Sequence, residues 1–174
     1  MTDIVIRRLE PGDDRSSFAS GNAELDLFFK QYAGQNQFRL HIGITYVAVQ
    51  GARILGFATV SSGSIEIDDL PRTEVRRLPR YPIPVLRLAR LAVDGTAQGL
   101  GVGKLLLRTV LQIALSQRDS TGCLGVVVDA KPEAVDFYTR YGFVPLDVIE
   151  GQLGTRPAPT PMFLALGSVP VGRG

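Results

Sequence analysis

The sequence predicts an α/β fold with a mixed central sheet and flanking helices. Short β-branched or apolar runs alternate along the chain with three stretches of helical period. The chain has 174 residues, of which 45% are apolar, and this is enough for one packed core. No repeat or linker is visible, so we expect a single domain over residues 1–174 with the element order β-α-β-β-β-α-β-α-β-β.

The first half of the chain predicts one helix and three strands, followed by an irregular segment. The helix places Leu25, Phe28 and Tyr32 at helical spacing, and the strands are rich in β-branched residues. A segment rich in Pro and Arg shows no period and is expected to be a loop. The expected elements are strands at 3–9, 44–49 and 54–67, a helix at 22–34, a tight turn at 50–53 and a loop at 69–84.

The second half of the chain alternates further strands with two helices. Pro132 suits the first turn of a helix, and Gly142 suits the position that follows the last turn. An apolar run bounded by Gly122 and Asp129 predicts a buried strand. The expected elements are strands at 84–93, 124–128, 143–146 and 162–166, helices at 102–116 and 132–141, a turn at 94–99 and a loop at 151–161.

Residue counts exclude several kinds of site. The chain holds one cysteine, Cys123, and one histidine, His41. A disulfide framework, a cysteine-based zinc site and a histidine-rich metal site are therefore excluded, and we expect no metal. We expect Cys123 to be an inert small hydrophobe and His41 to be a loop or surface residue. No apolar stretch approaches the ~20 residues of a membrane helix, and no signal-peptide pattern is visible at the N-terminus.

Basic residues are unevenly distributed, although the formal net charge is only +2. Sixteen of the nineteen basic residues are arginine, and six of these lie between positions 72 and 90 beside a single acid, Glu74. The six are Arg72, Arg76, Arg77, Arg80, Arg87 and Arg90. Because arginine forms forked hydrogen bonds to phosphate, the cluster is either a phosphate-binding surface or an ordinary solvated loop.

A glycine-rich loop at residues 98–104 joins a predicted strand to a predicted helix. Glycines let the backbone approach a ligand, and the N–H groups of a helix N-terminus favour an anion. The loop fails the P-loop pattern at Gln98 and Leu105, and it also lacks the G-x-G-x-x-G spacing of a dinucleotide site. The pattern Gln/Arg-x-x-Gly-x-Gly/Ala does fit, as Gln98, Gly101 and Gly103.

A second motif follows about 30 residues later, as Ala134-x-x-Phe137-Tyr138-x-x-Tyr141-Gly142-Phe143. Together the two motifs resemble the GNAT acetyltransferases, over roughly residues 86–146. The resemblance implies the GNAT (acyl-CoA N-acyltransferase) fold and acetyl-CoA as co-substrate, with its pyrophosphate on the loop amides. The implied cofactor-binding residues are Leu91, Ala92, Val93, Gln98, Gly99, Leu100, Gly101, Val102, Gly103 and Lys104.

The N-terminal half is similar to one branch of that family, the GNAT toxins of toxin–antitoxin pairs. The similarity lies in Phe18, Gly21-Asn22, Leu25-Asp26, Gln35-Asn36-Gln37, Tyr46-Val47-Ala48-Val49, the Pro/Arg segment 71–84 and Arg90-Leu91-Ala92-Val93-Asp94. It implies acetylation of the α-amino group of aminoacyl-tRNA, a cytoplasmic homodimer and a ribbon-helix-helix antitoxin. The long Pro/Gly-containing insert at 147–161 departs from the family pattern.

The expected chemistry needs few catalytic side chains. An α-amino group has a pKa of about 7.7 to 8, so it is substantially neutral near pH 7 and needs little help from a base. By resemblance, the backbone N–H near Val93 stabilises the oxyanion, and Tyr138 protonates the leaving thiolate. Without the family motif, Tyr138 reads as a core aromatic residue. Phe137 and Phe143 are expected in the core, and Asp129 is expected to cap the helix that follows Lys131.

The arginine cluster would bind the acceptor if the acceptor is a polyanion. Acetyl-CoA already has its phosphate site in the glycine loop, and phosphate neutralisation supplies most nucleic-acid affinity. The residues expected to hold tRNA are Arg72, Arg76, Arg77, Arg80 and Arg90. Two alternatives stay open: an N-acetyltransferase acting on a small amine or a protein N-terminus, and a non-catalytic binding module with the same fold.

Overall fold

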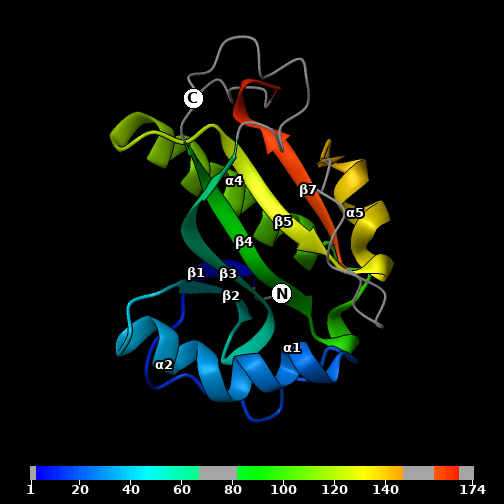
Figure 1. Cartoon of the computed structure of the whole chain (residues 1–174). Coiled ribbons are helices and arrows are strands. Elements are labelled where there is room, and N and C mark those ends of the chain that lie inside the picture. The colour runs from blue at the N-terminus through cyan, green and yellow to red at the C-terminus, as the bar shows by residue number, and fades with distance from the viewer. Residues whose placement is uncertain (1–2, 67–81, 147–158, 169–174) are drawn as a thin grey trace. The chain divides into compact units, whose positions relative to one another are not determined.

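The computed structural model describes residues 3–66, 82–146 and 159–168. Seven strands are found in these ranges, in the sheet order β1-β2-β3-β4-β5-β7-β6 (Figure 1). The expected order of helices and strands along the chain is confirmed. The loop expected at 69–84 and the insert at 147–161 fall almost wholly outside the described residues. None of the helices within these ranges is long and apolar enough to cross a membrane.

The chain divides into two compact units, residues 1–61 with 88–113 (unit 1) and residues 62–87 with 114–174 (unit 2). Unit 1 carries the N-terminal helices and the glycine loop, and unit 2 carries the Tyr138 helix. The elements of unit 1 are β1 (Val5–Arg8), α1 (Ala23–Leu27), the π-helical turn η1 (Phe28–Tyr32), α2 (Ala33–Phe38) and β2 (Ile44–Gln50), with parts of β3 (Arg53–Ile65), β4 (Ile83–Val93) and α4 (Val102–Ser120) and the short η3 (Gly95–Ala97). The expectation of a single domain stays a prediction.

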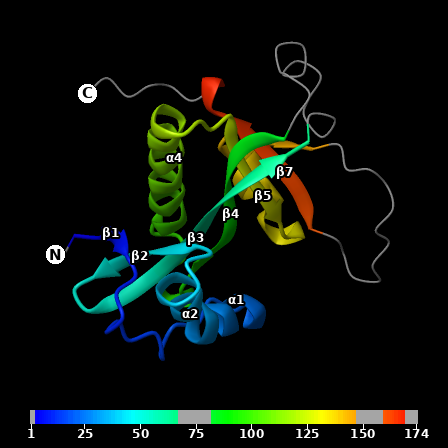
Figure 2. The same ribbon diagram turned by 60° about the vertical axis from the view of Figure 1, so that its left-hand side comes forward.

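Strands β1, β2 and β3 form an antiparallel meander in unit 1. The expected tight turn is present, since Gln50 pairs with Arg53 across a two-residue loop in which Gly51 has a φ of +63°. In Figure 2 these strands separate α1 and α2 from the first turns of α4. A Cβ at Gly56 would lie 2.9 Å from Val102 Cγ1 and 3.0 Å from the Ala92 carbonyl. Gly56 therefore allows α4 to approach β3 closely.

The N-terminal helix is longer than expected, because α1, η1 and α2 continue one another from Ala23 to Phe38 instead of ending at Gly34. Tertiary bonds of Gln37 hold the additional turn. Its side-chain amide donates to the Leu9 carbonyl at 3.0 Å and accepts from the Thr45 N–H at 2.9 Å. These long-range contacts outweigh the weak helix propensity of glycine.

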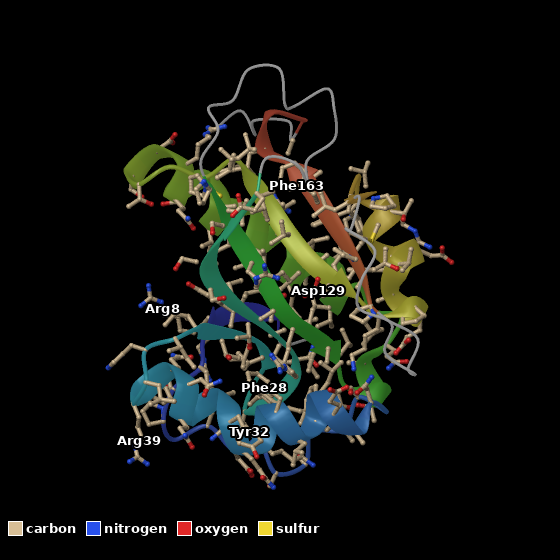
Figure 3. The ribbon with its side chains drawn as sticks, in the orientation of Figure 1. Arg8, Phe28, Tyr32, Arg39, Asp129 and Phe163 are labelled. Carbon is tan, nitrogen blue, oxygen red and sulfur yellow. The ribbon has the colours of Figure 1, made fainter. Side chains whose placement is uncertain are left out.

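The π-helical turn η1 lets two consecutive aromatic residues, Phe28 and Phe29, be buried together. Phe29 stacks on Phe57 with ring centroids 4.3 Å apart and planes 2° from parallel. The Phe29 carbonyl accepts a hydrogen bond from Arg15 Nη1 at 2.7 Å. Figure 3 shows Phe28 on the sheet side of this helix and Arg39 on its outer side. The buried cluster of unit 1 is completed by Leu9, Phe18, Ala33, Val47, Val49, Ile54 and Ala92.

Unit 2 is built on the antiparallel pairs β5–β7 and β6–β7. Its elements are β5 (Gly125–Ala130), η4 (Pro132–Ala134), α5 (Val135–Arg140), β6 (Val144–Pro145), β7 (Thr160–Ala165) and η5 (Leu166–Ser168), with the remaining parts of β3, β4 and α4. In Figure 1 α5 lies beside β7. The buried cluster consists of Ile65, Ile83, Val85, Val127 and Phe163.

Helix α4 runs to Ser120, four residues beyond the expected end at Ser116. It stops at Gly122, whose φ of +98° ends the helical path. The N–H groups of Thr121 and Gly122 both donate to the Gln117 carbonyl. The helix therefore ends where a glycine supplies a positive φ, whereas the apolar period in the sequence fades earlier.

Gly125 is the tightest point of the β5–β7 pair, and we expect Gly125→Ala to destabilise the protein by about 3 kcal/mol or more. A Cβ there would lie 2.3 Å from the Leu164 carbonyl oxygen and 2.4 Å from Phe163 Cε2. Urea unfolding of the variant measures the loss. Gly167→Ala is the control, since nothing lies within 4 Å of its added Cβ. Equal stability of the two variants would contradict the close approach.

Candidate functional site

The glycine loop follows β4 and η3 in unit 1 and is exposed at Gln98, Gly99, Leu100 and Gly101. Gly99 and Gly101 have φ values of +83° and +80°, and no atom lies within 4 Å of a Cβ built on either. The backbone conformation therefore requires glycine at both positions, and the space beside each of them is open to a ligand.

Helix α4 begins within this stretch, at Val102, whose side chain is buried. The N–H of Leu105 donates to the Gly101 carbonyl, so the N–H groups of residues 102–104 precede the first helical hydrogen bond. The first turn carries no acidic side chain, and Lys104 is exposed in it. Open amides, a helix N-terminus and a lysine together form a surface suited to a phosphate group.

Asp94 lies between the end of β4 and the glycine loop, and its side chain is buried. Its carboxylate accepts hydrogen bonds from the Ala19 N–H at 3.0 Å, the Thr96 N–H at 3.0 Å and Thr96 Oγ1 at 2.6 Å. Arg53 lies 3.5 Å away. Burial raises the pKa of Asp94, but the hydrogen bonds and Arg53 lower it more, so the carboxyl titrates below its ordinary range.

The side chain of Gln98 contacts the protein itself. Its Nε2 donates to the Ser20 carbonyl at 3.2 Å, at the segment that leads into α1. Sequence analysis places Gln98 among the cofactor-binding residues, whereas the structure gives its side-chain amide a partner within the protein. Leu91, Ala92 and Val93 form the end of β4, immediately before Asp94.

Two arginines of the cluster lie within the described residues, and both contact the protein. The Arg90 guanidinium lies over the Phe28 ring, 4.0 Å from its centroid. Arg87 pairs with Asp129 at 3.4 Å. The expectation that Asp129 caps a helix is wrong, because Asp129 lies in β5 and Lys131 is the N-cap residue of η4. Figure 3 labels Asp129 on its strand. The remaining arginines, Arg72, Arg76, Arg77 and Arg80, lie outside the described residues.

Tyr138 lies in α5 of unit 2, at the helix end. The Phe143 N–H donates to the Tyr138 carbonyl and the Gly142 N–H to the Thr139 carbonyl, while Gly142 has a φ of +94°. This is a Schellman motif, and its apolar contact is the Tyr138–Phe143 ring pair, 5.3 Å apart. Tyr138 is 4% exposed, and burial raises the pKa of its hydroxyl.

The structure also shows the burial of the other residues for which the sequence gave an expectation. Phe143 is in the core as expected, whereas Phe137 is only half-buried. His41 is exposed in the loop after α2, with a φ of +53°. Cys123 is buried, as expected of a small hydrophobe, and burial raises the pKa of its thiol. No group of three potential metal ligands is found within the described residues.

Sequence reasoning gave no role to Asp94, Thr96 or Arg53. One signal was present, because Asp-x-Thr directly after a strand is typical of a turn in which the carboxylate binds the N–H two residues later. The 75-residue separation between Asp94 and Ala19 left no local signal at all.

A family model, a related protein and solved structures all connect this chain with acetyl transfer. A family model described as an acetyltransferase (GNAT) domain matches residues 20–156. A tRNA-acetylating toxin of Mycobacterium tuberculosis is 36% identical over 138 residues, covering 79% of this chain and 82% of the toxin. A solved structure of AtaT complexed with acetyl-methionyl-tRNAfMet has a TM-score of 0.84 and 27% identity, covering 95% of this chain and 96% of the other. AtaTR bound with AcCoA has a TM-score of 0.78 and 27% identity, with 95% of each chain covered.

We expect Asp94→Asn to lower the free energy of unfolding at pH 7 by about 1–3 kcal/mol, because an amide cannot replace the carboxylate as acceptor for every donor. A carboxyl whose pKa is depressed in the folded state stabilises the fold above its unfolded pKa, about 3.9, and this contribution is lost as pH falls through the folded pKa. The stability difference between parent and variant should therefore shrink on acidification below about pH 4.

Urea unfolding between pH 2 and pH 7 measures this difference. Asp119→Asn is the control, because Asp119 forms an exposed pair with Arg118 at 3.3 Å and its loss should change stability little. A constant difference between parent and Asp94→Asn at every pH would contradict the role of the Asp94 charge.

Proposed function

This chain belongs to the GNAT family of acetyltransferases, and from that membership we propose that it transfers the acetyl group of acetyl-CoA to the α-amino group of aminoacyl-tRNA. The observation that carries the proposal is its similarity to the mycobacterial tRNA-acetylating toxin over most of both chains. Such a transfer blocks translation, so the chain would act as the toxin of a toxin–antitoxin pair.

We place acetyl-CoA on unit 1. The pyrophosphate would lie on the amides of residues 99–104, where the positive φ values of Gly99 and Gly101 present the backbone. The pantetheine arm and thioester would run along the backbone of Leu91, Ala92 and Val93. These placements fit the open loop, the unpaired helix N-terminus and the exposed Lys104.

In the transfer, the amine nitrogen forms a bond to the acetyl carbonyl carbon, the carbon–sulfur bond breaks, and the nitrogen releases one proton to solvent. With a pKa of about 7.7 to 8, roughly a tenth or more of the attacking α-amino group is neutral at pH 7, so the exposed His41 is not needed as a base. The tetrahedral oxyanion would accept a hydrogen bond from the Val93 N–H. The next N–H along the chain, that of Asp94, already donates to the Leu55 carbonyl at 2.8 Å and is not free for this role.

The leaving thiolate needs a proton, and we assign its donor as Tyr138. Burial raises the pKa of this phenol, so it stays in the acid form throughout the physiological pH range. The Schellman motif of α5 and the contact with Phe143 fix its ring. The assignment to this role rests on its position in the family motif.

The acceptor would be held through its phosphates. Arg90 is the proposed ligand within the described residues, together with Arg72, Arg76, Arg77 and Arg80 outside them. Arg87 is left out because Asp129 already neutralises it. Further proposals follow from the family branch: a homodimer, a ribbon-helix-helix antitoxin as partner, and action in the cytoplasm, where translation takes place.

Acetyl transfer to defined acceptors tests this function. Purified protein and labelled acetyl-CoA are incubated with aminoacyl-tRNA, deacylated tRNA, a polyamine and a peptide with a free N-terminus. Label in aminoacyl-tRNA that is lost when the ester bond is hydrolysed supports the proposal. Transfer to the polyamine or the peptide alone would replace it with a small-amine or N-terminal acetyltransferase. Binding of acetyl-CoA without any transfer would indicate a binding module.

We expect Gly101→Asp to abolish acetyl-CoA binding, because it places a carboxylate against the pyrophosphate. Gly101→Asn is the matched control. It has nearly the same shape, and asparagine tolerates the same positive φ, so the two variants differ in charge. Calorimetry should show binding weakened strongly in the Asp variant and much less in the Asn variant. Equal affinities in parent and Asp variant would place the pyrophosphate elsewhere.

We expect Tyr138→Phe to lower kcat by roughly 10²–10⁴-fold with little change in acetyl-CoA affinity, since it removes a general acid and keeps the aromatic packing. Tyr141→Phe is the control in the same region, because Tyr141 is half-buried and contacts Phe137 at 5.1 Å. Steady-state acetylation and calorimetry provide the two readouts. A Tyr138→Phe enzyme as active as the parent would reduce Tyr138 to a core residue.

A further inference from the structure

Four residues of unit 1 form a clasp between the segment before α1 and the glycine loop. They are Ala19 and Ser20 on one side and Asp94 and Gln98 on the other, and the backbone of Gly95 adds one further bond. The Ala19 N–H donates to the Asp94 carboxylate at 3.0 Å, the Gly95 N–H to the Ala19 carbonyl at 2.8 Å, and Gln98 Nε2 to the Ser20 carbonyl at 3.2 Å. In Figure 1 the start of α1 lies beside the chain that follows β4.

The clasp continues into the first turn of α1. The Ser20 N–H and hydroxyl donate to the Asp26 carboxylate, at 3.0 Å and 2.6 Å to Oδ1. Asn22 caps the helix, accepting from the Leu25 N–H at 3.1 Å. The position of α1 is therefore set by the segment that Gln98 and Asp94 hold.

The same helix contacts β4 a second time, through Phe28. The Arg90 guanidinium lies 4.0 Å from the centroid of this ring. Arg90 lies in β4 and Asp94 directly follows that strand, so the helix is attached to β4 through Phe28 and to the residue after β4 through the clasp. The carboxylate partners found for arginines in the described part of the chain belong to Arg7, Arg53, Arg87 and Arg118, which leaves the charge of Arg90 available to an anion.

We propose that Gln98 is a positioning residue: it fixes the start of α1 on the glycine loop, and through Phe28 it holds Arg90 in place for the acceptor. This inference rests on the proposed function, in which Arg90 contacts an acceptor phosphate. It separates Gln98 from the residues that bind acetyl-CoA.

The arrangement couples the two substrates. A glycine loop ordered by acetyl-CoA holds the Gln98 donor in place, and the clasp then holds the helix that carries Phe28. Acetyl-CoA should therefore tighten acceptor binding, and the acceptor should tighten acetyl-CoA binding by the same factor. Loss of the Gln98 donor should remove this mutual effect while the amides of the glycine loop keep their intrinsic affinity.

Gln98→Met removes the donor with little change in volume, Gln98→Arg retains a donor, and Gln117→Met is the matched control. Gln117 Nε2 also donates to a backbone carbonyl, that of Gly122 at 3.4 Å, but near the far end of α4. Loss of one such hydrogen bond should raise the KM for aminoacyl-tRNA roughly 3- to 10-fold in Gln98→Met, with the acetyl-CoA Kd changed less than about twofold. Gln98→Arg should restore the KM, and Gln117→Met should leave both constants as in the parent.

Amide hydrogen exchange over residues 19–26, on the protein without substrates, tests the clasp independently of the acceptor. Faster exchange there in Gln98→Met, with normal exchange in Gln117→Met, is the expected result. Unchanged exchange, or a raised acetyl-CoA Kd with a normal acceptor KM, would overturn the positioning role. Faster exchange with an unchanged KM would overturn the coupling to Arg90. A parent enzyme that does not acetylate aminoacyl-tRNA would instead refute the proposed function, and the exchange data would still report on the clasp.

Discussion

The carboxylate of Asp94 receives three protein hydrogen bonds at the point where β4 ends and the glycine loop begins. A buried charge without such partners would be strongly unfavourable, so this position requires Ala19 and Thr96 to stay in place. Ala19 is 75 residues away in sequence, and the bond brings the N-terminal segment to the strand end. The glycine loop, the start of α1 and the strand end at Val93 are therefore organised around one side chain.

The sequence predicted the order of the seven strands in the described part of the chain and of the main helices because most of them have a local signal. Alternation marks β2 and β3, the apolar run marks β5, and Gly142 marks the end of α5 through its backbone conformation. The ends of the longer helices were not predictable in the same way. Gln37 holds the last turn of α2 through Leu9 and Thr45, which are distant in sequence, and α4 continues until Gly122 stops it.

The residues of the candidate site show the same difference between local signals and long-range contacts. Gly99 and Gly101 were predictable because their role lies in the backbone, and Tyr138 because it belongs to a short motif. The partners of Gln98 and Arg90 were not, since hydrogen bonding to Ser20 and stacking on Phe28 depend on where a separate segment folds. Asp129 was misjudged because a carboxylate just before a helix suits a cap, and only the adjacent strand with Arg87 reveals the ion pair.

The π-helical turn at Phe28–Tyr32 holds one more residue than an α-helical turn would. A length change of a single residue within it therefore has a different meaning from one elsewhere in the helix. Deleting the exposed Lys30 would remove that extra residue and allow a regular α-helix, so the residues on the N-terminal side would keep their orientation around the axis relative to α2. Phe28 would stay near the Arg90 guanidinium, whereas a one-residue deletion within α2 would rotate every residue on its N-terminal side by about 100°. The π-helical turn is therefore a point at which this helix can lose one residue while Phe28 stays in the buried cluster of unit 1.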